Sequence, residues 1–403
     1  MIPLAEARDR VLAGCRPLDP VTLPLADALG CVLVGDVESG ELIPPFANTA
    51  MDGYALLAAD TVGASADAPV ELDVAGTVAA GAEPDVAVAP GVAVRIMTGA
   101  PLPPGADAIV MVELTEPLDG GARVRVNAQV PEGNHVRPAG DDVGVGDVVM
   151  RSGTTLSPAH LGVLASLGRL EVDVRSRPRV GVVSTGDELV EGPVPLRPGQ
   201  IRDSNRLTLL ALCRAAGFVP VDLGLVRDDR QLIEDALRVG VRTCDAVITS
   251  GGVSMGEFDY VKAVLDDIGD MSWMQVAIRP AKPLAFGLVD DVPVFGLPGN
   301  PVSSMVSFEL FARPGLRKMM GCTQLDRRRL RAVAADGLAR RPDGKIHFAR
   351  VTLSADGADP VVRSAGGQGS HQLRAMADAD ALAVVPDGDG VPAGGTVEVI
   401  PLD

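Results

Sequence analysis

Between Arg179 and Met320, short apolar runs alternate with amphipathic stretches, and no other feature of the sequence constrains the fold as strongly. The apolar runs lie at 179–184, 219–226, 245–250 and 292–297. The stretches between and after them predict helices at 204–216, 229–239, 258–268 and 301–319. Strands that alternate with helices in this way form βαβ units. The segment therefore predicts a central three-layer α/β/α domain with a mostly parallel sheet.

The remaining segments predict a multidomain chain that combines α/β and β architecture. Residues 41–137 contain short strands broken by Gly and Pro, which predicts a β-rich inserted domain. Helix-like segments at 1–14 and 157–168 flank this insertion and predict a small helical and extended linking domain. After Cys322, strands alternate with turn signals and predict a C-terminal β-barrel-like domain. The predicted domains are 1–40 with 138–177, 41–137, 178–324 and 325–403.

Composition excludes several classes of function. The formal net charge of -17 disfavours a nucleic-acid-binding or anionic-membrane surface, because both need clustered positive charge. No uncharged apolar run approaches the roughly 18 residues of a membrane span, and the first residues lack a signal-peptide pattern, so we expect a cytoplasmic protein. The 5 cysteines are scattered and form no CxxC pair, so we expect reduced core residues rather than disulfides or a zinc site.

A glycine-rich loop follows the run at 245–250 and has the composition of a phosphate-binding loop. It contains Ser250, Gly251, Gly252 and Ser254 and precedes a predicted helix. Ligands of open parallel sheets bind at the carboxyl ends of strands, and successive backbone N–H groups in such a loop bind anions. The alternative is a turn that needs glycine only for a positive φ.

Acidic residues fall at several predicted strand ends. They are Asp187, Glu188, Asp228, Asp229 and Asp259. Carboxylates from separate strands, together with substrate phosphates, suit Mg²⁺. Any one of these residues can instead cap a helix.

Two further segments predict an oxyanion site. Lys282 lies between Pro280 and Pro283, which restrict the backbone around this cation. A second glycine-rich segment, 366–371, offers backbone N–H groups and the Ser370 hydroxyl. An exposed loop with incidental charge is the alternative for Lys282. Neither a GxSxG nor an HExxH motif occurs, so a serine hydrolase triad and a zinc protease site are unsupported.

Nine segments in series resemble the molybdopterin molybdenumtransferase family of the bacterial MoeA type, which is related to the C-terminal E domain of gephyrin. They are PPFANTAMDGYA, RIMTGAPLPPGAD, STGDEL, GQIRDSN, RDD, TSGGVSMGEFDY, IRPAKP, GLPGNPVS and GGQGSH. The resemblance implies transfer of molybdenum from molybdate to adenylylated molybdopterin, with Mg²⁺-dependent release of AMP. It also implies a homodimer, and as partners the adenylyltransferase of the preceding step and the apo-molybdoenzymes.

The resemblance also assigns roles to residues. The catalytic set that it implies is Asp52, Thr98, Asp142, Glu188, Asp228 and Asp259, of which Asp259 and Glu188 bind the metal. The set near molybdate is Arg279, Lys282, Pro298, Pro301, Arg350 and Ser370. The active site implied lies between the α/β domain of one subunit and the β-rich domain of its partner.

Three residues depart from the family's usual pattern. Ala47 and Thr49 stand where the family often has Asp and Ser, and Arg279 stands where its first cation is usually Lys. Alternatives to the transferase are the adenylyltransferase, whose loop typically reads GGTG where this chain has 251–254, and a noncatalytic dimeric scaffold. The sequence does not separate molybdate from the near-isosteric tungstate.

Overall fold

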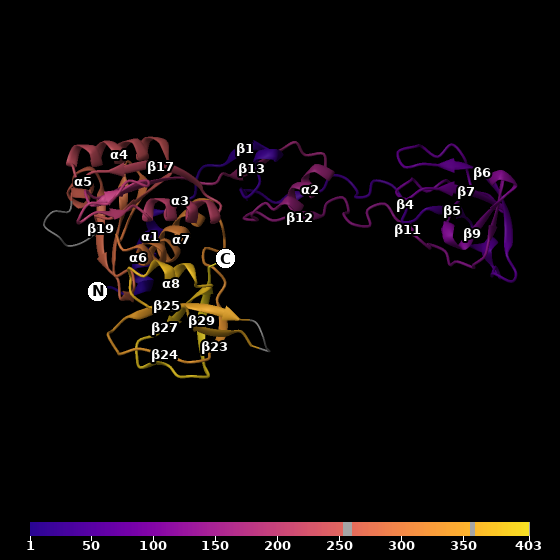
Figure 1. Ribbon diagram of the computed structural model, residues 1–403. Coiled ribbons are helices and arrows are strands. Elements are labelled where there is room, and N and C mark those ends of the chain that lie inside the picture. The colour runs from indigo at the N-terminus through magenta and orange to yellow at the C-terminus, as the bar shows by residue number, and fades with distance from the viewer. Residues whose placement is uncertain (253–259, 355–358, 403) are drawn as a thin grey trace. The chain divides into compact units, whose positions relative to one another are not determined.

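The computed structural model describes residues 1–252, 260–354 and 359–402. The chain forms two compact units, whose elements are labelled in Figure 1. The first comprises Met1–Val34, Gly153–Ser157 and Val172–Asp403, and the second comprises Gly35–Ser152 and Pro158–Glu171. The division into four domains given above stays a prediction beside these two units.

A six-stranded sheet forms the centre of the first unit, in the order β17-β14-β18-β22-β21-β19. The four parallel strands are β17 (Val219–Val226), β14 (Arg179–Thr185), β18 (Ala246–Ser250) and β22 (Val292–Leu297). These confirm the four runs expected to form the parallel sheet. Two antiparallel strands, β21 (Pro283–Val289) and β19 (Asp270–Gln275), extend one edge.

Helices cover both faces of this sheet, as the three-layer prediction requires (Figure 1). They are α3 (Asn205–Ala215), α4 (Arg230–Thr243), α5 (Tyr260–Ile268), α6 (Pro301–Ser307) and α7 (Arg313–Met319). One apolar core joins α4 and α5 to the sheet through residues such as Ile233, Val261 and Val247. A second core, on the other face, contains Leu209 of α3 and Val302 of α6.

The helix expected at 301–319 is interrupted, because α6 continues through a π-helical turn (Phe308–Ala312) into α7. Pro314 has no N–H to donate to the carbonyl of Leu310 four residues earlier. Arg8 of α1 (Leu4–Gly14) instead donates from Nη1 to this carbonyl at 3.0 Å. Ala7 and Val11 of α1 are buried in the same core.

The C-terminal part of the first unit is a closed barrel, in the ring order β25-β26-β23-β29-β27 with β27 returning to β25. Its strands are β23 (Leu330–Ala334), β25 (Ile346–Ser354), β26 (Val361–Ser364), β27 (Ala381–Val385) and β29 (Gly395–Pro401). The short strand β20 (Ile278–Arg279) pairs in parallel with β25. Helix α8 (Leu373–Ala377) lies between β26 and β27 in sequence. The expected barrel-like β domain is confirmed.

The second unit contains a six-stranded sheet in the order β8-β5-β7-β6-β10-β9. Its strands are β5 (Gly53–Leu56), β6 (Val70–Val78), β7 (Val92–Ile96), β8 (Ala108–Met111), β9 (Thr115–Leu118) and β10 (Arg123–Val126). Tyr54, Leu72 and Val110 lie in its core. Position 53 accepts only glycine, because a Cβ atom there would lie 2.0 Å from the Val110 carbonyl oxygen. The β-rich character expected for 41–137 is confirmed.

Small elements complete the two units. In the first unit they are β1 (Val21–Pro24), β2 (Val32–Leu33), β13 (Glu171–Arg175), β15 (Leu189–Val190), β16 (Ile201–Arg202), β24 (Leu338–Ala339), β28 (Gly390–Val391) and the short helix Leu25–Asp27. In the second they are β3 (Val37–Glu38), β4 (Asn48–Thr49), β11 (Val136–Arg137), β12 (Val148–Met150), α2 (Pro158–Ser166) and the short helices Ala58–Thr61, Val112–Leu114 and Asp119–Gly121.

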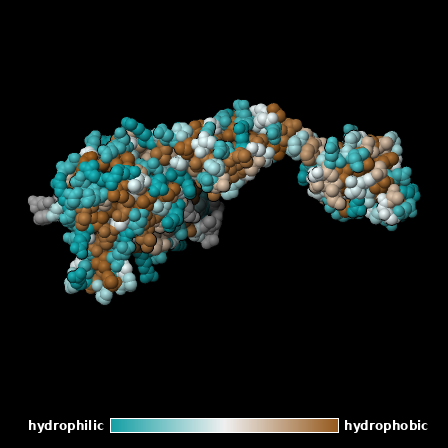
Figure 2. Space-filling model, turned by 90° about the horizontal axis from the view of Figure 1, so that it is seen from above, coloured by the Kyte–Doolittle hydropathy of each residue, from teal (hydrophilic) through white to brown (hydrophobic). Residues whose placement is uncertain are grey.

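The state of the cysteines and the polarity of the surface match what the composition predicts. All five cysteines are buried and free, and burial raises the pKa of the Cys15 and Cys213 thiols to about 12. Within the described ranges, no helix combines the length and the apolar character needed to cross a bilayer. On the face that Figure 2 shows, hydrophilic residues are interspersed with hydrophobic ones.

Candidate functional site

The carboxyl ends of three adjacent parallel strands meet the start of α3. Ser184 Oγ, near the end of β14, donates to Asp203 Oδ1 at 3.1 Å. Asn205 Nδ2 donates to Ser250 Oγ, at the end of β18, at 2.8 Å and to the Gly299 carbonyl, after β22, at 2.7 Å. The loops that the sequence marks as candidate binding loops therefore converge at this edge of the sheet.

The predicted phosphate-binding loop is described as far as Gly252, so Ser254 lies outside the described residues. Gly251 and Gly252 have φ values of 98° and 69°, which favour glycine. The Gly251 N–H donates to the Leu297 carbonyl at 3.1 Å, so this N–H joins two strand-end loops instead of facing a ligand. Of the predicted loop residues, the structure brings Ser250 and Gly251 against the loop after β22.

The predicted acidic residues occupy separate local positions. The Asp187 N–H donates to Asp228 Oδ2 and the Asp228 N–H donates to Asp187 Oδ1, each at 3.3 Å. Asp229 caps α4 by accepting from the Leu232 N–H at 3.0 Å. Glu188 is exposed, and Asp259 lies outside the described residues. Within the described part of the chain, no group of three or more His, Cys, Asp or Glu residues is arranged to hold a metal ion.

Arg350 on β25 is a buried cation with incomplete hydrogen bonding. Its relative exposure is 0%, and burial lowers its pKa. Nη2 donates to the carbonyls of Gly367 at 2.6 Å and Gly369 at 3.2 Å, whereas Nε and Nη1 have no partner among the described residues. Arginine buried without a carboxylate is costly, and unpaired donors add to this cost. Its free donors are therefore available for an anion.

Gln368 fixes the glycine-rich segment around Arg350. The Arg350 N–H donates to Gln368 Oε1 at 2.9 Å, and Gln368 Nε2 donates back to the Arg350 carbonyl at 3.0 Å. The Ser370 carbonyl accepts from the Val302 N–H at 3.1 Å, at the start of α6. The structure thus brings three members of the predicted oxyanion set, Arg350, Ser370 and Pro301, into neighbouring segments.

Arg279 and Lys282 supply the remaining predicted cations. Both side chains are exposed, and neither has a hydrogen bond or ion pair with another described residue. Ala281, between the two prolines, has a φ of 72° and is buried. The Lys282 carbonyl accepts from the Val276 N–H at 2.7 Å. The backbone of this segment is therefore held in place while the two charged groups stay open to a ligand.

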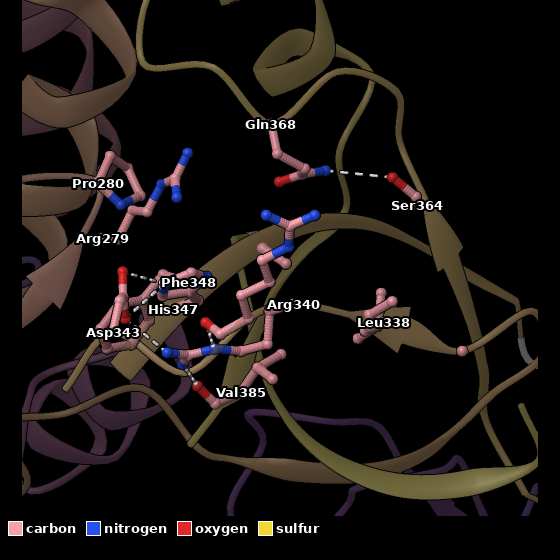
Figure 3. Close-up of a pocket in the computed structure, with 14 residues that line it drawn as sticks. Arg279, Pro280, Leu338, Arg340, Asp343, His347, Phe348, Ser364, Gln368 and Val385 are labelled. Carbon is pink, nitrogen blue, oxygen red and sulfur yellow. Dashed lines mark hydrogen bonds and ion pairs between the residues drawn. The ribbon is translucent and has the colours of Figure 1, made fainter. Parts of the chain in front are cut away.

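A hollow of about 430 Å³ adjoins Arg279 (Figure 3). The Arg279 side chain and the Gln368 amide lie on facing sides of it in this view. Arg340 lines it and donates to Asp343, Asp387 and four backbone carbonyls. Sequence reasoning missed Arg340, Asp343 and Gln368, and the only available signal was their proximity to turn and glycine-rich motifs.

Neighbouring charged groups along this hollow shift the pKa values of Asp343 and His347. Desolvation opposes ionisation of Asp343, yet hydrogen bonds from His347 and Lys345 lower its pKa to about 2. Desolvation lowers the pKa of His347, although the hydrogen bond to Asp343 acts in the opposite direction. His347 lies opposite Arg279 in the β20–β25 pairing. The wall of the hollow therefore carries fixed positive charge that Asp343 partly offsets.

The second unit has its own hollow, of about 210 Å³, lined by Asp52, Thr98 and Arg95 among others. Asp52 Oδ1 accepts from the Thr98 N–H at 2.6 Å and from Thr98 Oγ1 at 2.8 Å. These two bonds lower the pKa of Asp52. Asp142, in the same unit, does not line this hollow, and its N–H donates to the Ile43 carbonyl at 2.9 Å. Of the three predicted residues, the structure therefore pairs Asp52 and Thr98.

Comparisons with known proteins cover almost the whole chain. Family models match the MoeA N-terminal region (domain I and II) at 2–168, a probable molybdopterin binding domain at 181–318, and the MoeA C-terminal region (domain IV) at 331–402. Molybdopterin molybdenumtransferase 2 of Mycobacterium tuberculosis (strain ATCC 25618 / H37Rv) is 42% identical over 384 residues, which are 94% of this chain and 93% of the relative. The chain belongs to the molybdopterin molybdenumtransferase family.

Other members of this family agree in sequence and fold. The molybdopterin molybdenumtransferase of Haemophilus influenzae (strain ATCC 51907 / DSM 11121 / KW20 / Rd) is 37% identical, across 100% of this chain and 99% of the relative. The crystal structure of the molybdopterin biosynthesis MoeA protein from Pyrococcus horikoshii OT3 is 29% identical, with a TM-score of 0.81 and 100% of both chains covered. The resemblance stated from the motifs is confirmed.

The departures from the usual family motif have local explanations. Thr49 is buried, and its Oγ1 donates to the Met51 carbonyl at 2.7 Å and accepts from the Met51 N–H at 3.2 Å. The turn needs only a hydroxyl that makes these two hydrogen bonds, and threonine supplies it as serine would. Ala47 contributes its carbonyl to the Leu102 N–H at 2.9 Å, which needs no particular side chain.

Proposed function

We propose that this member of the molybdopterin molybdenumtransferase family inserts molybdenum from molybdate into adenylylated molybdopterin and releases AMP. Arg350 carries the proposal, because it is fully buried and, among the residues that the structure describes, has no carboxylate partner and leaves Nε and Nη1 unpaired beside the Ser370 segment. A tetrahedral oxyanion supplies the charge and acceptors that this arginine lacks. Full-length similarity to named molybdopterin molybdenumtransferases supports the same activity.

In this proposal, molybdate binds between Arg350 and the segment that carries Arg279 and Lys282. Ser370 would contribute a polar group, while the remaining two residues of the set, Pro298 and Pro301, would shape the loop after β22. Two exposed cations and one buried cation suit a dianion. The electrostatic attraction to the dianion is strongest for the buried cation, because it is shielded from water. A chain with a net charge of -17 needs such a local positive site to retain molybdate.

The pterin substrate would place its phosphates on the loop that comprises Ser250, Gly251, Gly252 and Ser254, beside Glu188, Asp228 and Asp259. Water would cleave the phosphoanhydride, so that AMP leaves and the pterin keeps its own phosphate. The dithiolene sulfurs would form two bonds to molybdenum while two oxo groups leave as hydroxide or water, with no change in oxidation state. Mg²⁺, held by Asp259, Glu188 and phosphate oxygens, would neutralise phosphate charge.

We also propose a homodimer in which Asp52, Thr98 and Asp142 of the β-rich unit act on substrate bound to the partner subunit. The ionised Asp52, held by Thr98, supports a role for this pair. The adenylyltransferase would supply the substrate and apo-molybdoenzymes would receive the product. The proposed location is the cytoplasm.

The test is AMP release from adenylylated molybdopterin and Mg²⁺, with and without molybdate, coupled to reconstitution of an apo-molybdoenzyme. The proposal expects molybdate-dependent AMP release together with reconstitution. Substrate binding without AMP release under any oxyanion would contradict it. AMP release with tungstate but not with molybdate would mean that the enzyme transfers tungsten by the same class of reaction.

A further inference from the structure

Asn205 joins two candidate binding loops by one side-chain amide. Its Nδ2 donates to Ser250 Oγ at 2.8 Å and to the Gly299 carbonyl at 2.7 Å. Ser250 ends β18 and Gly299 follows β22, and these strands are neighbours in the sheet. The amide therefore spans the gap between two loops that belong to adjacent strands.

The residue that carries this amide is firmly anchored. Arg206, next in the chain, is buried, and its Nε donates to Asp203 Oδ2 at 3.0 Å. Asp203 also accepts from Ser184 Oγ, and Arg206 Nη1 binds both carboxylate oxygens of Asp222 on β17. The first turn of α3 is thus fixed to the sheet on both sides of Asn205, so its amide has little freedom to move.

We propose that Asn205 is a positioning residue, which sets the distance between the substrate phosphates and the oxyanion. The inference rests on the proposed function, in which Ser250 begins the phosphate-binding loop and Gly299 lies between Pro298 and Pro301 of the oxyanion set. Each amide proton holds one loop, and Asn205 acts through these loops without touching either reactant.

This arrangement predicts which kinetic constant depends on Asn205. The Gly251 N–H also bonds the Leu297 carbonyl, so the ends of β18 and β22 stay joined when the amide is removed, while the Ser250 hydroxyl and the Gly299 carbonyl lose their common donor. Binding of either reactant alone then changes little. Their relative placement changes, and a misplacement of about 1 Å lowers the rate of a positioned reaction about 100-fold. The loss therefore appears in kcat and not in KM.

Two substitutions test the two bonds. Asn205→Ala removes both bonds. Asn205→Asp keeps an acceptor for the Ser250 hydroxyl but presents an oxygen to the Gly299 carbonyl, so the second bond is lost. Leu207→Ala, on the same helix and 73% exposed, is the control. With purified full-length protein, AMP release is measured against molybdate concentration, and thermal unfolding is followed in parallel.

We expect kcat to fall at least about tenfold in both Asn205 variants, with KM for molybdate within about threefold of wild type and Tm close to that of Leu207→Ala. An unchanged kcat overturns the inference, and so does a loss of activity matched by unfolding or by an equal rise in KM.

A second measurement does not depend on the proposed reaction. Amide hydrogen exchange of 250–252 and 299–301 is compared between Asn205→Ala and Leu207→Ala in the absence of substrate. Faster exchange in both segments of Asn205→Ala supports the link between the loops, and equal exchange overturns it. If wild-type protein releases no AMP, the proposed function fails while this comparison still decides the role of Asn205.

Discussion

At the scale of single residues, Arg350 lowers the stability of the folded protein at the candidate site. A buried guanidinium with two nitrogens that lack a partner in the described part of the chain is unfavourable in the protein without ligand. Gln368 holds the backbone of Arg350 by two hydrogen bonds, which keeps the cation where it is. Strain of this kind persists when the surrounding structure fixes it, and it is relieved when the missing partner binds.

Molybdate should therefore stabilise the wild-type protein and not an Arg350→Met variant. At a ligand concentration 100 times Kd, stabilisation of about 2.7 kcal/mol is expected for wild type. Differential scanning fluorimetry with increasing molybdate measures the rise in Tm. Arg374→Ala serves as the control, because the side chain of Arg374 is 95% exposed and should leave the response unchanged. An equal rise in Tm for Arg350→Met would remove Arg350 from the oxyanion site.

Asp343 makes stability depend on acid pH. Its folded pKa of about 2 is below the ordinary value of about 3.9, so its ionised form favours folding above about pH 4. This contribution disappears as pH falls from about 4 towards 2. The free energy of unfolding of wild type should exceed that of Asp343→Asn at pH 6, and the difference should shrink at pH 3. Urea titrations at both pH values measure this, with Asp336→Asn at an exposed ion pair as the control. A difference that does not vary with pH would contradict the assignment.

At the scale of elements, the sequence predicts repeated patterns well and single exceptions poorly. The four parallel strands follow from apolar runs of β-branched residues, and the structure confirms them. The antiparallel strands β19 and β21 were missed, because β21 begins with Pro283 and contains Gly287. Its turn to β22 uses Asp290 and Asp291 with φ of 49° and 65°, where asparagine and glycine are the usual signal.

Candidate site residues were predictable as motifs, and their contacts were not. Asp52 and Thr98 are far apart in sequence, and they meet because β5 pairs with β7, with Gly53 opposite Ile96. Likewise, the unpaired donors of Arg350 depend on how the segment 366–371 folds over β25. The register between paired strands and the path of a loop depend on contacts between residues far apart in the sequence, so local sequence patterns do not predict them.

The interrupted helix around Pro314 gives a prediction for α1. Arg8→Met should lower the free energy of unfolding by about 1 to 2 kcal/mol, because the Leu310 carbonyl loses its donor in a partly buried place. Arg8 Nη2 also pairs with Asp326 at 2.7 Å, and an exposed pair contributes about 0 to 1 kcal/mol. Asp326→Asn therefore separates the two effects and should cost less. Equal losses in urea unfolding would show that the ion pair, and not the carbonyl, accounts for the role of Arg8.

At the scale of the whole molecule, the proposed dimer divides one active site between two chains. Asp52→Asn and Asp259→Asn should each abolish AMP release while leaving the dimer intact. When the two variants are unfolded, mixed and refolded together, about half of the dimers are mixed and each has one site with both carboxylates. About a quarter of wild-type activity should return. No recovery, with mixed dimers confirmed by native mass spectrometry, would contradict a shared site.

The packing of α1 also has a consequence for synthesis of the chain. Helix α1 leaves the ribosome well before the segment that it packs against, because Arg8 bonds a carbonyl 302 positions later. At roughly 5 to 20 residues per second, the apolar face with Ala7 and Val11 waits on the order of 15 to 60 s for its partner. The inserted second unit is complete long before then. We therefore expect the second unit to fold while the apolar face of α1 is still exposed on the nascent chain.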